Sequence, residues 1–168
     1  MKPLSTLAQS VRASTTMAID TQFKKMRAEG IDVIGFSVGE PDFPTPERIK
    51  QAGIRAIEAD QTKYTPTPGT LAVRQAVCQR LAEDWGLHYT TDEVVVTGGG
   101  KPVLYTALKA LVNPGDEVIL PAPYWVSYSE LIQMVGGTPV VVENTEENGF
   151  NLNPQQLRQA ITPKPQAL

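Results

Sequence analysis

Hydrophobic and polar positions follow two different periods along this chain, and the change falls near residue 93. Beyond it, short runs of β-branched residues alternate with stretches in which an apolar residue recurs every three or four positions. The pattern predicts strands at 94–96, 118–120 and 138–142, with helices at 103–111 and 125–134 between them. A strand–helix–strand–helix–strand order predicts a parallel sheet with right-handed crossovers and helices packed against it.

The pattern before residue 93 is mainly helical. It predicts a polar arm leading into a helix over 7–29, helices at 46–57 and 70–85, and a short strand at 33–36. Gly30 and Gly86 end the first and last of these helices, and Thr45 is placed to cap the second, with Pro46 at its first position. At the end of the chain we expect a helix over 153–161 and the start of a fourth strand at 166–168.

Charge is balanced along the chain, with 15 basic and 18 acidic residues among 168 and a net charge of −3. This balance gives no electrostatic footprint for nucleic acid or an anionic membrane surface, so we expect a small-molecule ligand. No window approaches the roughly 20 apolar residues that a membrane helix needs, and the first residues lack the apolar core of a secretory signal. A cytoplasmic protein with no nucleic-acid and no membrane partner is expected.

Cysteine and histidine are scarce in the sequence. A single cysteine, Cys78, excludes an internal disulfide, and a single histidine, His88, leaves few ways to build a metal site. We therefore predict no metal site, and Cys78 is most simply a small buried residue.

A glycine-rich loop, Thr97-Gly98-Gly99-Gly100-Lys101-Pro102, joins the strand pattern at 94–96 to the next helix pattern. Glycines allow a close backbone approach, and the N–H groups and dipole of the following helix favour a phosphate. Lys101 adds a positive charge at the rim. The loop fits neither the P-loop nor the dinucleotide fingerprint, so from spacing alone a phosphate site and a plain turn with a solvated lysine are equally supported.

An aromatic segment, Pro121-Ala122-Pro123-Tyr124-Trp125-Val126-Ser127-Tyr128, follows the strand predicted at 118–120. It therefore lies at the same sheet edge as the glycine loop, where an aromatic face suits a flat heteroaromatic ligand. The alternative is that Trp125 and the tyrosines pack in a core or a subunit interface, and both can hold. Two Pro- and Gly-rich loops, 39–46 and 63–69, are candidates for the same rim.

Together these segments resemble the class I and II aminotransferases, the fold-type I pyridoxal-phosphate enzymes, and in particular their bacterial-type aspartate aminotransferase branch. The resemblance covers nearly the whole chain. It depends on segments that are weak singly but occur in the family's order: Val38-Gly39-Glu40-Pro41-Asp42-Phe43 with Thr45-Pro46, Thr62-Lys63-Tyr64-Thr65-Pro66 with Gly69, Val96 to Tyr105, Asn113-Pro114-Gly115-Asp116-Glu117-Val118, Pro123 to Tyr128, and Gly136-Gly137.

The resemblance implies a truncated α/β three-layer sandwich of the pyridoxal-phosphate-dependent transferase type. Residues 1–45 would be an N-terminal arm and part of the small domain, and residues 46–168 an incomplete large domain that binds the cofactor. That domain would hold the first parallel strands of the large sheet.

The resemblance also implies a set of cofactor-binding residues for pyridoxal 5'-phosphate. Gly99, Gly100 and Lys101 match the loop that binds the cofactor phosphate, and Trp125 matches the aromatic residue that stacks on the pyridine ring. Tyr64 resembles the tyrosine that reaches the phosphate of the neighbouring subunit, which implies a homodimer in the full-length enzyme.

The substrate-binding residues implied by the resemblance are Gly39, Trp125, Thr16 and Arg12. The backbone at Gly39 would receive the substrate α-carboxylate. Thr16 and Lys101 would meet a side-chain carboxylate, with Arg12 close by in sequence, although a solvated Arg12 is the simpler interpretation. Pro102 stands where many relatives have glutamine, which removes a side-chain donor.

The family's reaction needs a lysine that holds the cofactor as a Schiff base and a carboxylate that keeps its ring nitrogen protonated. Neither is found in these residues, and no catalytic residue is predicted in this chain. None of the eight lysines has the family's Ser-Lys context: Lys2, Lys24, Lys25, Lys50, Lys63, Lys101, Lys109 and Lys164. We therefore expect the chain alone to be inactive and, with a parallel sheet that stops at Leu168, not to be a stable monomer.

The function implied is transfer of an amino group between an amino acid and a 2-oxo acid, with aspartate or another acidic or aromatic substrate. One alternative is a truncated, non-catalytic module that pairs through the Tyr64 loop and the aromatic segment. A nucleotide-binding α/β domain is less favoured because both nucleotide fingerprints fail.

Overall fold

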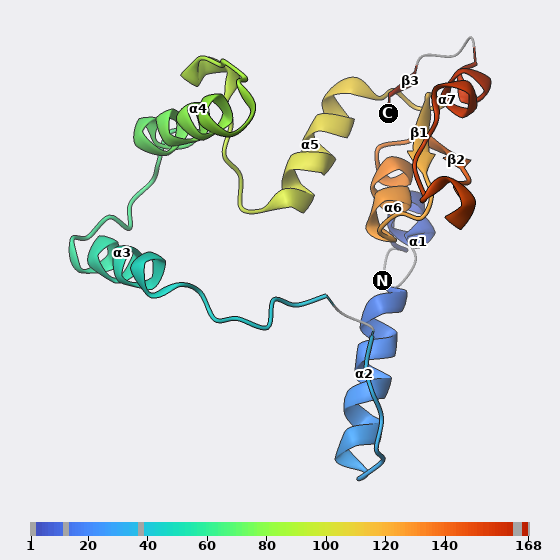
Figure 1. Ribbon diagram of the computed structural model, residues 1–168, viewed down its shortest axis with the longest axis horizontal. Helices are drawn as coiled ribbons and strands as arrows, with labels where there is room; N and C mark the ends of the chain where they lie inside the picture. Colours follow the sequence, from blue (N-terminus) through green and yellow to red (C-terminus); the bar gives the residue numbers. More distant parts are fainter. Residues whose placement is uncertain (1–2, 12–13, 37–38, 163–165, 168) are drawn as a thin grey trace. The chain divides into compact units, whose positions relative to one another are not determined.

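The computed structural model describes residues 3–11, 14–36, 39–162 and 166–167 (Figure 1). Contacts within the chain divide it into two units, one formed by Met1–Gly39 with Val103–Leu168 and the other by Glu40–Pro102. These units do not correspond to the domains 1–45 and 46–168 implied by the resemblance, and that division stays a prediction.

The first unit contains a three-stranded parallel sheet in the order β2-β1-β3, with β1 (Glu117–Pro121) in the middle. Glu117 is opposite Thr138 of β2 (Thr138–Val142), and it is also opposite Gln166 of β3 (Gln166–Ala167). Within β1 the three consecutive residues Val118, Ile119 and Leu120 are all buried, as is typical of a parallel strand covered on both faces. The strands predicted at 118–120 and 138–142 are confirmed, and so is the start of the strand at 166.

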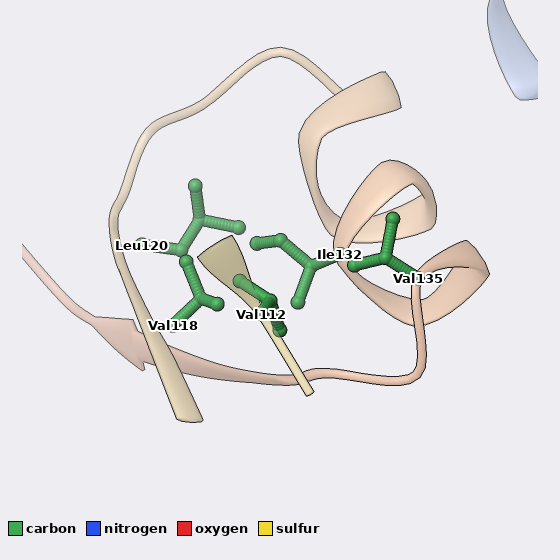
Figure 2. Packing of buried hydrophobic residues seen from close by; sticks show 5 residues of the cluster. All are labelled: Val112, Val118, Leu120, Ile132 and Val135. Atoms are coloured by element: carbon green, nitrogen blue, oxygen red, sulfur yellow. The ribbon is translucent and has the colours of Figure 1, made fainter. Parts of the chain in front are cut away.

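The hydrophobic core lies between β1 and the helix α6 (Ser127–Met134) (Figure 2). Val118 and Leu120 of the strand face Ile132 and the adjoining Val135, and Val112 fills the space between them. Ile132 is only 2% exposed. Burial of these side chains is the main source of stability for the unit, because each contributes roughly 1.5–3 kcal/mol on leaving water.

Two glycines after α6 bring the chain close to this core. A Cβ on Gly137 would lie 2.9 Å from Val112 Cγ1 and 3.2 Å from Ile132 Cγ2, so only hydrogen fits. Gly136 has a φ of +92°, which side chains rarely tolerate, and its carbonyl accepts the N–H of Gly115 at 2.9 Å. The Gly136-Gly137 pair therefore allows the backbone between α6 and β2 to pack directly against the core side chains.

Further helices of the first unit are α1 (Thr6–Ser10), α2 (Thr15–Ala28), α5 (Gly100–Leu111, of which residues 103–111 belong here) and α7 (Pro154–Ala160). Ser14 caps α2 by accepting the N–H of Met17 at 3.3 Å. After α2 the chain returns beside it (Figure 1), and Gly35 packs so tightly on the Phe23 ring that a Cβ would lie 2.8 Å from it.

The second unit contains α3 (Glu47–Glu58), α4 (Leu71–Trp85) and the short 3-10 helix η1 (Thr91–Glu93). Gly86 ends α4 with a left-handed φ of +66°, as predicted. Arg74 of α4 joins the helix to η1, because its Nη1 donates to the Thr91 carbonyl at 2.6 Å. The apolar stripe predicted on α3 is largely exposed. On α4 the stripe is half-buried at Val77 and Leu81 and exposed at Val73 and Trp85, and Cys78 beside it is half-buried rather than buried.

Two predicted strands are wrong. Residues 33–36 form no ladder and instead pack beside α2. Residues 94–96 form no ladder either, and the Val96 N–H donates instead to the Pro68 carbonyl of a loop at 3.0 Å. A β-rich sequence becomes a strand only where a neighbour completes its hydrogen bonds, and among the described residues neither segment has one.

The predicted cap of α3 is also wrong. Pro46 itself is the N-cap residue, the helix begins at Glu47, and no side chain caps it. Proline is suited to either position because its fixed φ fits the helix entrance and its missing N–H costs no hydrogen bond there.

Candidate functional site

The glycine loop lies at the start of α5, where the sequence places it. Gly100 is the first helical residue, and the Thr97 hydroxyl donates to the Gly99 carbonyl at 2.8 Å. Gly99 has a φ of +133°, a conformation that only glycine adopts at little cost. The loop therefore ends at the first turn of α5, whose N–H groups have no partner within the helix.

The surroundings of the loop fit an anion. A Cβ added at Gly98, Gly99 or Gly100 would meet nothing within 4 Å, so open space adjoins the backbone. The first turn of α5 carries no acidic residue, and Lys101 is exposed within it. An open backbone, helix N–H groups and a cation are what a phosphate binds, whereas a plain turn has no need of three consecutive glycines.

The 63–69 loop is bonded to the residues that precede the glycine loop. Pro68 accepts the N–H of Val96 at 3.0 Å, and the Gly69 backbone lies against the Val96 side chain, 3.0 Å from where its own Cβ would be. Gly69 has a φ of +97°. The structure thus brings two of the predicted rim segments together within the second unit.

The aromatic segment connects β1 to α6 and divides into two parts. Tyr124 packs against the hydrophobic core, whereas Trp125 is 43% exposed. The Trp125 ring meets the Tyr128 ring edge-on, with centroids 5.6 Å apart and an interplanar angle of 88°. The packing interpretation is confirmed for Tyr124, which is partly buried against the core. A role for the exposed Trp125 ring toward a ligand stays a prediction.

Asn144, which is absent from the predicted residues, is the buried polar side chain at this sheet edge. It is 7% exposed, and its Nδ2 donates to the Ala122 carbonyl at 2.7 Å. Its position two residues after the parallel strand β2, on the same edge as the aromatic segment, is the sequence signal that could have drawn attention to it.

The remaining predicted residues are more dispersed. Tyr64 is fully exposed, and a Cβ added to Gly39 would meet nothing within 4 Å. Thr16 is half-buried near the start of α2. Arg12 lies outside the described residues. Gly39, Thr16 and Trp125 belong to one unit, and Tyr64 with the glycine loop to the other.

The two carboxyl groups with a lowered pKa lie in local helix-end interactions rather than among the predicted site residues. The pKa of Glu47 is lowered by Lys50 and then by Gln51, and that of Glu93 by the backbone N–H and then the hydroxyl of Thr90. Among the described residues no three histidine, cysteine or acidic side chains are grouped to hold a metal ion. In the same part of the chain, no helix has the length and apolarity to cross a membrane.

The sequence from residue 31 to 168 matches the model of the family described as aminotransferase class I and II. Since this match covers most of the chain, the chain belongs to that family. The resemblance seen in the ordered motifs is confirmed, and the match gives no support to the nucleotide-binding alternative.

Curated relatives carry more particular names. The chain is 49% identical over 161 residues to an aspartate/prephenate aminotransferase of Cereibacter sphaeroides, covering 96% of this chain and 40% of that protein. It is 47% identical over 159 residues to an aspartate aminotransferase of Geobacillus stearothermophilus, covering 95% and 40%. The chain thus spans about two fifths of the length of the relatives it matches.

Solved structures agree with this assignment. The aspartate aminotransferase of Thermus thermophilus with maleate has a TM-score of 0.92 and 41% identity over 98% of this chain and 43% of that one. The enzyme of Rhizobium meliloti has a TM-score of 0.91 and 38% identity over 98% and 41%. The predicted fold class, the α/β fold of these transferases, is confirmed.

Proposed function

We propose that the protein carrying this chain uses pyridoxal 5'-phosphate to transfer an amino group between an amino acid and a 2-oxo acid. Family membership supports the reaction class. The observation on this chain that carries the proposal is the open glycine loop at the N-terminus of α5, with Lys101 in its first turn.

In this proposal the N–H groups of Gly99, Gly100 and Lys101 bind the cofactor phosphate. The helix dipole and the Lys101 ammonium both favour the phosphate's negative charge. Pro102 has no N–H, so the hydrogen-bond donors of this turn are concentrated at the three residues before it.

Trp125 is proposed to stack on the cofactor's pyridine ring. When bound, that ring withdraws electrons from the carbon that exchanges the amino group. The half-exposed indole offers a flat apolar face, and the edge-on contact with Tyr128 limits its rotation.

Gly39, Thr16 and Arg12 are proposed to bind the substrate together with Trp125. A backbone N–H at Gly39 would receive the α-carboxylate, while Thr16, Arg12 and Lys101 would meet a second carboxylate. An acidic substrate of the aspartate type is supported by the names of the relatives and by the maleate, a dicarboxylate, in the Thermus thermophilus structure.

Tyr64 is proposed to reach the phosphate bound by a second subunit, so the enzyme would be a homodimer. Its complete exposure leaves the phenol accessible to such a partner. The cytoplasmic location expected from the sequence belongs to the same proposal. The 168 residues alone are expected not to catalyse transfer, because none of their lysines has the context of the family's cofactor-holding lysine.

The phosphate role can be tested with Lys101→Ala in the intact protein, freed of cofactor. We expect the dissociation constant for pyridoxal 5'-phosphate to rise about ten- to a hundredfold, because hydrogen bonds between charged groups contribute about 1.5–3 kcal/mol. Binding of pyridoxal, which lacks the phosphate, should change little. The matched control is Lys109→Ala, in the last turn of the same helix.

Equal weakening of both compounds by Lys101→Ala, or equal effects of the two lysine variants, would contradict the assignment. Amino transfer from aspartate to a 2-oxo acid by the intact protein tests the reaction class separately. A protein that forms dimers but shows no transfer would favour the non-catalytic pairing module.

A further inference from the structure

Asn144 is a buried amide at the carboxyl end of β2, and its contacts reach the start of the aromatic segment. Its Nδ2 donates to the Ala122 carbonyl at 2.7 Å and lies 3.5 Å from the Val142 carbonyl. Both partners are acceptors, so exchanging the amide's N and O would place an oxygen against two carbonyl oxygens. The donor side of the amide is therefore fixed toward Ala122.

This side chain extends the pairing of β1 with β2 beyond the last strand residue. The Ala122 N–H donates to the Val142 carbonyl at 2.9 Å, and the Ala122 carbonyl accepts from Asn144. Both backbone groups of Ala122 are thus satisfied by residues 142–144. An amide side chain replaces the backbone N–H that a longer strand would have supplied.

Ala122 is three residues before Trp125, so its anchoring determines where the aromatic segment leaves the sheet. At the far end of the segment the Tyr128 N–H donates to the Trp125 carbonyl at 2.9 Å, and the two rings meet edge-on. Tyr124, between the two ends, packs on the core. The backbone is therefore anchored on both sides of Trp125, and Asn144 supplies the anchor that comes from the segment after β2.

We propose that Asn144 is a positioning residue, which fixes the Trp125 ring for stacking on the cofactor by holding the Ala122 carbonyl. The proposal rests on the proposed function in one respect, the role of Trp125 toward the cofactor. It extends that function by assigning a part to a residue that itself touches neither cofactor nor substrate.

The test uses the intact protein labelled with 5-fluorotryptophan, with the Trp125 fluorine resonance assigned by its loss in Trp125→Phe. Asn144→Leu keeps the approximate shape and removes the donor. We expect the Trp125 resonance to shift or broaden before any cofactor is added, and the dissociation constant for pyridoxal 5'-phosphate to rise about tenfold. Asn144→Ser, whose hydroxyl is too short to reach Ala122, serves if the leucine variant does not fold.

The matched control is Asn151→Leu, because the Asn151 Nδ2 also donates to two carbonyls, those of Asn148 and Gly149, each at 3.2 Å, but at an exposed site. It should leave both the resonance and the affinity unchanged. In a Trp125→Ala background, Asn144→Leu should weaken cofactor binding no further, because its effect passes through the ring.

An unmoved Trp125 resonance in a folded Asn144 variant would overturn the proposal, as would additive losses of affinity in the double variant. A resonance that moves while neither Asn144→Leu nor Trp125→Ala alters cofactor affinity has a different meaning. That outcome would overturn the role of Trp125 in the proposed function while supporting the attachment of the ring to Asn144.

Discussion

The two loops that carry the candidate site are held in different ways. The loop from β1 to α6 starts on a buried strand, is bonded to Asn144 and packs Tyr124 on the core. The glycine loop is held by the Thr97 hydroxyl, and the Val96 N–H just before it is bonded to Pro68. The first loop is fixed by packing on the core, whereas the glycine loop is held by backbone and hydroxyl hydrogen bonds beside open space.

The sheet region and residues 40–102 also differ in how far their apolar helix faces are buried. Ile132 of α6 is 2% exposed, whereas Ile57 of α3 is 67% exposed although it belongs to an equally clear apolar stripe. An amphipathic pattern shows which face a helix can bury. Burial itself depends on a partner surface, which α6 finds on β1.

The largest expected effect comes from truncating the isoleucines of these two helices. Ile132→Ala should lower the free energy of unfolding by about 2–5 kcal/mol, because it leaves a cavity in the core. Ile57→Ala should cost less than about 0.5 kcal/mol, as exposed substitutions do. Urea unfolding of the intact protein, followed by circular dichroism, measures both; equal losses would break the comparison by showing that the α3 face is covered.

Two glycines sharpen the comparison further. Gly137→Ala should destabilise the fold by about 1–3 kcal/mol through overpacking, since the new methyl would crowd Val112 and Ile132. Gly98→Ala should leave stability nearly unchanged, because its Cβ meets nothing, yet weaken binding of pyridoxal 5'-phosphate by obstructing the backbone. Thermal melts and cofactor titrations of both variants would contradict this account if the two effects were exchanged.

These differences also explain how far the sequence was predictive. The strand at 138–142 and the helix stop at Gly86 follow from local pattern and from glycine's conformational freedom, and both were correct. The strands at 33–36 and 94–96 failed because strand formation needs a neighbour, which no local pattern reveals.

Some residues of the candidate site could likewise be predicted from the sequence, and others could not. The glycine loop and Trp125 could be found from their motifs, since phosphate and aromatic binding need particular residue types at particular spacings. Asn144 belongs to no motif, and its position after the strand at 138–142 marks it only as a residue at that sheet edge. Its role could not be predicted, because it comes from a hydrogen bond to a residue 22 positions away. Whether the predicted site residues bind the cofactor stays a prediction.

The smallest effect concerns pH and the local bonds of the second unit. Thr90 lowers the pKa of Glu93 from its usual value of 4.5, first through its backbone N–H and then through its hydroxyl. The stabilisation is therefore fully present above the unfolded-state pKa and is lost as the pH falls through the lower, folded-state pKa. Glu93→Gln should flatten the acid side of the stability profile, measured as urea midpoints from about pH 6 to pH 3.

A partial variant serves as the control for this effect. Thr90→Ala removes the hydroxyl but keeps the backbone N–H, which is the larger cause, so it should flatten the profile less than Glu93→Gln. The reverse order of the two variants would contradict the assigned cause.

The central claim is that the glycine loop binds the phosphate of pyridoxal 5'-phosphate. The most direct measurement follows the backbone amide resonances of Gly99, Gly100 and Lys101 while the cofactor is added to the cofactor-free intact protein. We predict that these three shift with saturation and that pyridoxal without the phosphate moves them far less. Saturable binding of the cofactor that leaves all three amides unmoved would contradict the account.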